Sequence, residues 1–168
     1  MSQPSSSKYD KSAILSQEEI DTLHNIQDQL KPGKKLRDSI RNPKLIDDYI
    51  DDLQKIYEHL ENSGTETLPS NLPLSVVDTF ETSIETIYAN IKDAIKLLNL
   101  AAENVEEIGR IQRDGQVAEK DPKDINTNKS IFYDNLEQCR QLLIEAEKVV
   151  IRLKDADAVP KNPTANAG

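Results

Sequence analysis

Residues 77–108, VDTFETSIETIYANIKDAIKLLNLAAENVEEI, carry apolar side chains at alternating steps of three and four residues and contain neither Gly nor Pro. Steps that average about 3.5 residues keep these side chains on one side of an α-helix, and other helices have to cover such a stripe. The pattern therefore predicts one long helix with a continuous packing seam. The first seam consists of Val77, Phe80, Ile84, Ile87, Ile91, Ala94, Leu98, Ala101, Val105 and Ile108.

A second seam with the same spacing follows after a polar stretch. It consists of Phe132, Leu136, Cys139, Leu143, Ala146, Val150 and Leu153. Residues 113–129 hold Gly115 and Pro122, so we expect them to form a loop between helices over about 75–112 and 130–156. Two long seams joined by a loop predict an antiparallel helical hairpin.

Two shorter helices are predicted before the first seam. Ser16 and Glu19 have the spacing of a capping box, and the apolar spacing that follows them predicts the first of these helices. Asn42 followed by Pro43 predicts the start of the second, because proline loses nothing by lacking an N–H at the first helical position. The intervening segment KKLRDSIR predicts one short turn.

The predicted fold class is all-α, an elongated four-helix bundle in which the two shorter helices cover an antiparallel helical hairpin with coiled-coil-like seams. No segment has the alternating pattern of a β-strand. The predicted division of the chain is a disordered tail over 1–13, a single helical domain over 14–157 and a disordered tail over 158–168. Within the domain we expect a helical pair over 14–62, a hinge loop over 63–74 and the long hairpin over 75–157.

Composition argues against several classes of protein. The 168 residues include 30 acidic and 21 basic side chains, and the net charge of −9 opposes binding to nucleic acid or to an anionic membrane. Cys139 is the only cysteine, so the chain gives no sign of an oxidising compartment. Because we find neither a secretion signal nor an apolar run long enough to span a bilayer, we expect a soluble intracellular protein, nuclear or cytoplasmic.

Two features carry the enzyme alternatives. Residues 47–52, DDYIDD, place carboxylates one helical turn apart, a spacing that some metal-dependent enzymes use to hold magnesium and a diphosphate. His24 lies on a short predicted helix, as in histidine phosphotransfer domains, but LHNIQDQLKPG lacks the small residues and the lysine that follow the histidine there. Neither His24 nor His59 has a Cys or a second His at metal-binding spacing. We therefore expect no catalytic residue, cofactor or metal, and interpret 47–52 as an exposed acidic helix face.

One basic cluster interrupts this acidic chain, between the two shorter helices. It consists of Lys31, Lys34, Lys35, Arg37, Arg41 and Lys44. We interpret it as the candidate partner-binding site, for an acidic protein surface or a phosphate. The alternative is a solvated segment that pairs with nearby aspartates. If the cluster binds a partner, charge reversal at Lys34, Lys35 and Arg37 should weaken the complex in a salt-dependent way.

The segments IKDAIKLLNLAAENV (91–105) and FYDNLEQCRQLL (132–143) resemble the core of Mediator subunit 29, a helical subunit of a transcription coactivator. The resemblance is carried by Lys92, Leu98, Ala101, Ala102, Asn104, Phe132, Leu136 and Glu137. It implies a nuclear, non-enzymatic subunit that acts in transcription regulation by docking to other subunits. The chain departs from that family by having two predicted helices before this core, where the family has a Gln-rich start.

Long amphipathic helices without a catalytic motif predict a non-enzymatic interaction or scaffold subunit of an intracellular multiprotein complex, whose helical surfaces bind other protein subunits. One alternative is a self-associating coiled coil, in which the first seam pairs with a second copy of the chain. Another is the phosphotransfer-like or metal-dependent enzyme described above. A bare end of the long helix would mark a partner site, whereas full coverage would mean a self-contained bundle with a surface function.

Overall fold

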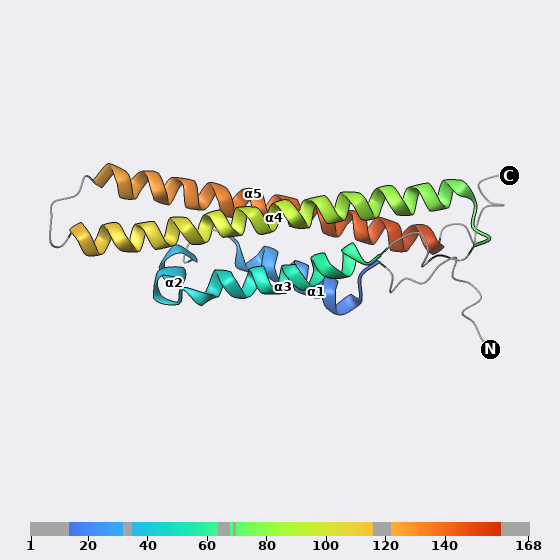
Figure 1. Ribbon diagram of the computed structural model, residues 1–168, viewed down its shortest axis with the longest axis horizontal. Helices are drawn as coiled ribbons and strands as arrows, with labels where there is room; N and C mark the ends of the chain where they lie inside the picture. The colour runs from blue at the N-terminus through green and yellow to red at the C-terminus, as the bar shows by residue number, and fades with distance from the viewer. Residues whose placement is uncertain (1–13, 32–34, 64–67, 69, 116–121, 159–168) are drawn as a thin grey trace.

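Five helices and no strand make up the described part of a computed structural model of the chain, which covers residues 14–31, 35–63, 68, 70–115 and 122–158. The helices are α1 (Gln17–Gln29), α2 (Lys35–Arg41), α3 (Lys44–Glu61), α4 (Leu74–Gly115) and α5 (Pro122–Ala158). α4 and α5 form a long antiparallel hairpin, and the three shorter helices lie along one side of it (Figure 1). The all-α class and the hairpin are as predicted. The predicted tails lie outside the described residues, except for Ala158, which is the last residue of α5.

The described residues contain a fifth helix beyond the four predicted, because the segment expected to form one short turn is the helix α2. This helix has seven residues, and its Leu36 and Ser39 are buried. A helix this short is not stable by itself, so burial against the rest of the bundle holds it. α2 and the start of α3 meet at Asn42, whose Oδ1 accepts a hydrogen bond from the Lys44 N–H at 3.2 Å. Pro43, directly before α3, makes no side-chain cap, so Asn42 supplies the side-chain acceptor at this helix start from the predicted position.

The hairpin of 42 and 37 residues contains the main packing interface of the molecule. All residues of the first and second seams are buried, except Val77, which is partly buried. The Cys139 thiol donates a hydrogen bond to the carbonyl oxygen of Ala94 at 3.5 Å, so the two helices approach closely where the seam has a small residue. The buried stripe of α4 continues past the predicted seam to Ile111. Described helices therefore cover this stripe from Phe80 to Ile111, whereas the first turn of α4 is less covered, since Val77 is partly buried and Leu74 is 80% exposed.

The predicted loop over 113–129 is too long. α4 continues to Gly115, and α5 begins at Pro122 rather than near residue 130. Proline suits the first helical position because its missing N–H has no helical acceptor there. Ile125 and Asn128 are partly buried, so even this polar segment has one covered side. Most residues of 113–129 are polar, so the sequence shows no helical spacing of apolar residues there.

The shorter helices attach to different members of the hairpin. α3 packs on α4, where the Tyr57 and Tyr88 rings stack with centroids 4.5 Å apart and the Tyr88 hydroxyl donates to that of Tyr57 at 2.6 Å. This hydrogen bond raises the pKa of Tyr88 to about 12. α1 packs on α5, where the Gln27 amide donates to Leu143 O at 3.2 Å and to Glu147 Oε1 at 2.7 Å. Each half of the hairpin is thus covered by its own helix.

Glu19 connects the start of α1 to α3. The Glu19 N–H donates to Ser16 Oγ at 3.1 Å, and the Ser16 N–H donates to Glu19 Oε1 at 2.9 Å, so the predicted capping box is present. The same carboxylate lies 2.8 Å from Nδ1 of His59 on α3. One side chain therefore serves both as a cap and as a link between helices.

Replacing Glu19 with Ala is expected to lower the free energy of unfolding by about 1–2 kcal/mol, because it removes part of the cap and the link to His59. Glu18→Ala is the matched control, since Glu18 lies in the same turn but is exposed, and its expected effect is below about 0.5 kcal/mol. Urea denaturation of both variants measures the difference. Equal losses would show that helix-end charge, and not the link, determines the effect.

Candidate interaction surface

Lys35 of the predicted basic cluster does not reach the surface. It is only 6% exposed, its Nζ donates to the Tyr49 hydroxyl at 2.9 Å, and it lies 5.2 Å from the centre of the Tyr49 ring. The apolar stem of a lysine can be buried in this way when the ammonium keeps a hydrogen-bond acceptor. In this arrangement Lys35 joins α2 to α3. Contrary to the prediction, its side chain is therefore buried and does not contribute to an exposed partner-binding surface.

The rest of the basic cluster is divided by the fold. Arg37, Arg41 and Lys44 are exposed on α2 and the first residue of α3, and no ion pair is recorded between them and any described residue. Lys31 is also exposed and lies 3.7 Å from Asp28, one turn earlier on the chain. Lys34 lies outside the described residues. We call Arg37, Arg41 and Lys44 the outer cations.

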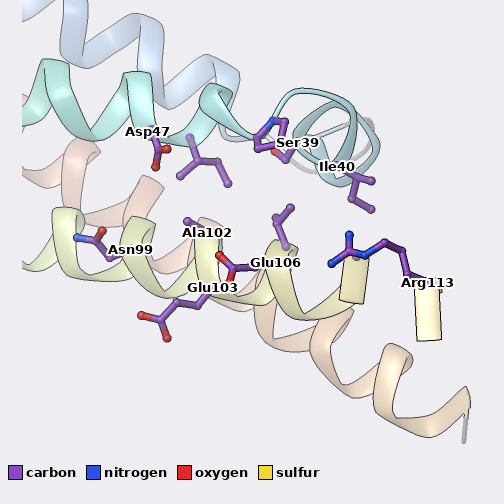
Figure 2. A pocket seen from close by; sticks show the side chains of 12 residues that line it. Ser39, Ile40, Asp47, Asn99, Ala102, Glu103, Glu106 and Arg113 are labelled. Carbon is purple, nitrogen blue, oxygen red and sulfur yellow. The ribbon is translucent and has the colours of Figure 1, made fainter. Parts of the chain in front are cut away.

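A groove lies between α4 and the bend that joins α2 to α3, and we call it the elbow groove (Figure 2). Its volume is about 360 Å³, which is in the lower range of ligand-binding clefts. The described lining residues are Ser39, Ile40, Pro43, Ile46 and Asp47 from the bend, and Asn99, Ala102, Glu103, Val105, Glu106, Gly109 and Arg113 from α4. Apolar side chains from both helices form its walls, and polar groups stand around them.

The polar groups of the elbow groove are mostly acceptors. Figure 2 shows Asp47 directed from α3 toward α4 and Arg113 reaching back along α4, whereas Glu106 lies over α4 itself at the edge of the groove and Glu103 points away. Arg113 extends back along α4 over Gly109, where an added Cβ would lie 3.4 Å from Nη1 of Arg113. Neither Asp47 nor Glu106 forms an ion pair with another described residue. The groove therefore has the Asp47 carboxylate and the Arg113 guanidinium directed into it and the Glu106 carboxylate at its edge.

Ser39 is the one lining residue with an unsatisfied buried group among those described. The residue is 1% exposed, and its Oγ has no hydrogen-bond partner in the described part of the chain. A buried hydroxyl without a partner costs about 1–3 kcal/mol relative to a satisfied one. Such groups are uncommon in folded proteins and require a specific explanation.

His24 and the aspartates of residues 47–52, which suggested an enzyme, lie on different helices, α1 and α3. His24 Nδ1 lies 3.3 Å from Glu147 Oε1, and His24 Nε2 lies 3.7 Å from Asp28 Oδ2, so the histidine lies between carboxylates of α5 and α1. The aspartates of 47–52 are exposed along α3, as expected of an acidic face. Across the described ranges, no group of three or more His, Cys, Asp or Glu side chains could hold a metal ion. Nor, over the same ranges, does any helix have the length and apolar character needed to cross a membrane.

Cys139 is buried in the second seam, opposite Ala94. Burial raises the pKa of its thiol to about 12, so the thiol stays protonated at neutral pH. A cysteine nucleophile needs the opposite, a thiolate in an electropositive and accessible place. Cys139 thus acts as a small apolar side chain in the close contact between α4 and α5.

Sequence reasoning missed the elbow groove. Its two sides are Ser39 to Asp47 and Asn99 to Arg113, which are more than 50 residues apart, and only the packing of α2 and α3 on α4 brings them together. Gly109 was the one available signal, since a glycine inside a long helix commonly marks a close approach or an open surface. Neither a family model, nor a curated protein sequence, nor a solved structure matches the chain.

Proposed function

We propose that this chain is a non-enzymatic interaction subunit of a multiprotein complex and that it docks through the elbow, the surface formed by the elbow groove and the outer cations. The observation that carries the proposal is the open groove with apolar walls and charged edges. Protein interfaces commonly combine an apolar centre with a polar rim. The long hairpin supplies a rigid support, because its seams are buried within the chain.

A transcription coactivator is the first complex to test, on the basis of the resemblance to Mediator subunit 29. Leu98, Ala101, Phe132 and Leu136, which carry much of that resemblance, are buried between α4 and α5. Such positions are apolar in any long helical hairpin, so they support the shared architecture more than a shared partner. The coactivator assignment is thus the finer part of the proposal and rests on the resemblance.

The self-associating alternative has less support than docking to another protein. It requires an apolar seam that is free to pair with a second copy, and all described seam residues except the partly buried Val77 are buried by helices of the same chain. Leu74, Leu100, Ile131 and Ile151 are exposed, but single exposed apolar residues are ordinary on protein surfaces. We therefore carry forward the docking subunit alone.

Native mass spectrometry of the tagged chain, purified from cells at its natural abundance, tests the proposal. We expect the chain to be recovered with other proteins, and the double variant Arg37→Glu, Arg41→Glu to lose them, because it reverses exposed charge at the elbow. The control is Lys148→Glu, Arg152→Glu, which reverses two exposed cations on α5. A stable monomer without any partner would contradict the proposal, and equal loss in both variants would contradict docking at the elbow.

A further inference from the structure

We propose that the elbow groove binds a lysine or arginine side chain presented by the protein partner. This inference rests on the proposed function and adds the chemistry of the contact. The juxtaposition that suggests it is a set of acceptor groups around apolar walls, in a groove that the described residues leave open (Figure 2).

Charge favours a cationic guest. Asp47, Glu103 and Glu106 are three carboxylates among its described lining residues, and Arg113 is the one cation there, so negative charge is in excess. The whole chain adds a net charge of −9, which raises the local concentration of basic segments near the surface. An anionic guest such as phosphate would meet two carboxylates, and the outer cations are not among the lining residues.

Hydrogen bonding also favours a guest that only donates. Ser39 Oγ has no partner among the described residues, and Asn99 donates its amide N–H to Ile95 O at 3.1 Å, which leaves Oδ1 of Asn99 to accept. A lysine ammonium has three donors and an arginine guanidinium has five, and neither has an acceptor. Because Ser39 Oγ is itself buried, a bound cation would satisfy this hydroxyl only after the side chains of the bend shift to admit it.

The apolar walls suit the stem of such a side chain. Ile40 and Pro43 stand on one side of the groove, and Ala102 and Val105 stand on the other. Lysine and arginine bury their methylene groups along apolar surface while the charged end stays near polar groups. The groove therefore matches both parts of the guest, the stem between the helices and the charged end near Asp47, Glu106 and Ser39.

The probe is a short helical peptide with lysine at every fourth position and alanine elsewhere, and a second peptide with glutamate in place of lysine. Binding to the full chain is followed by amide chemical shifts in NMR. We expect the lysine peptide to shift the amides of Ile40, Ala102 and Gly109 and the glutamate peptide to have no effect. Shifts confined to other parts of the chain would overturn the proposal.

Matched variants separate the groove from overall charge. Asp47→Asn with Glu106→Gln should weaken binding of the lysine peptide about fivefold or more, from the loss of two partly solvated ion pairs. Asp51→Asn with Glu58→Gln makes the same charge change at exposed positions of α3 outside the groove and should leave most of the binding intact. Equal weakening in the two variants would mean that the peptide responds to net charge only, and would overturn the proposal.

Ser39→Ala gives a second test that does not depend on charge. If the hydroxyl is unpaired in the free protein, its removal should leave the unfolding midpoint unchanged or raised while weakening peptide binding. A lowered midpoint would show that the hydroxyl stabilises α2 and would count against a role in binding.

If the groove variants lose the peptide but the cellular complex persists in native mass spectrometry, this inference fails and the proposed function stands. If the chain is a monomer in cells but still binds the lysine peptide at the groove, the proposed function fails and the binding chemistry of the groove stands.

Discussion

Replacing Leu98 with Ala should lower the free energy of unfolding by about 3 kcal/mol, in the middle of the range for a fully buried leucine. Leu98 is 0% exposed and lies near the middle of α4, against which both α3 and α5 pack. Truncation removes buried apolar surface and leaves a cavity inside the bundle, and long packed helices cannot easily move to close it. The thermal midpoint should fall with it, and circular dichroism during urea and thermal unfolding measures both.

Leu100→Ala is the matched control, because it makes the same chemical change two residues further along the same helix. Leu100 is 46% exposed, so its truncation should cost below about 1 kcal/mol. The contrast tests the register of the seam directly. If Leu100→Ala proved the more damaging of the two, the face of α4 assigned to the core would be wrong.

Reversing the charge at Lys35 should also destabilise the fold strongly. Lys35→Glu removes the hydrogen bond from Nζ to the Tyr49 hydroxyl and places a carboxylate in a site with 6% exposure. Loss of a hydrogen bond to a charged group and burial of the new charge should together cost at least about 2 kcal/mol. The melting temperature and the urea midpoint should both fall, with no partner present.

Arg37→Glu is the control for Lys35, because it reverses the same charge on the same helix at an exposed position. We expect a stability change below about 0.5 kcal/mol, so that any effect on a partner complex can be attributed to binding. Similar destabilisation by both variants would contradict the buried position of Lys35. The comparison also explains why a charge-reversal test that includes Lys35 would confuse misfolding with lost binding.

The candidate site could be predicted only in part. The basic cluster was recognisable from composition, but a run of cations does not reveal which side chains point inward. Lys35 lies two residues from Arg37, and a helix turns about 100° per residue, so the two project from opposite faces of α2. The elbow groove could not be recognised from the sequence. Gly109 alone does not indicate a groove, and no local pattern links Ser39 with Glu106.

Sequence by itself determined the elements that depend on local spacing. Short-range rules detect these elements, because each depends on residues within one or two helical turns. They are the two apolar seams, the capping box of Ser16 and Glu19, and the cap at Asn42. These features were sufficient for the all-α class and for the antiparallel hairpin of α4 and α5.

Tertiary structure decided what local spacing does not contain. α2 is helical because Leu36 and its neighbours are buried against the bundle, and the start of α5 at Pro122 has too few apolar residues to show a period. The same packing placed Lys35 inside, left the outer cations at the surface and opened the groove between Ser39 and Glu106. These outcomes depend on contacts between residues far apart in the chain, and such contacts form only when the helices have packed.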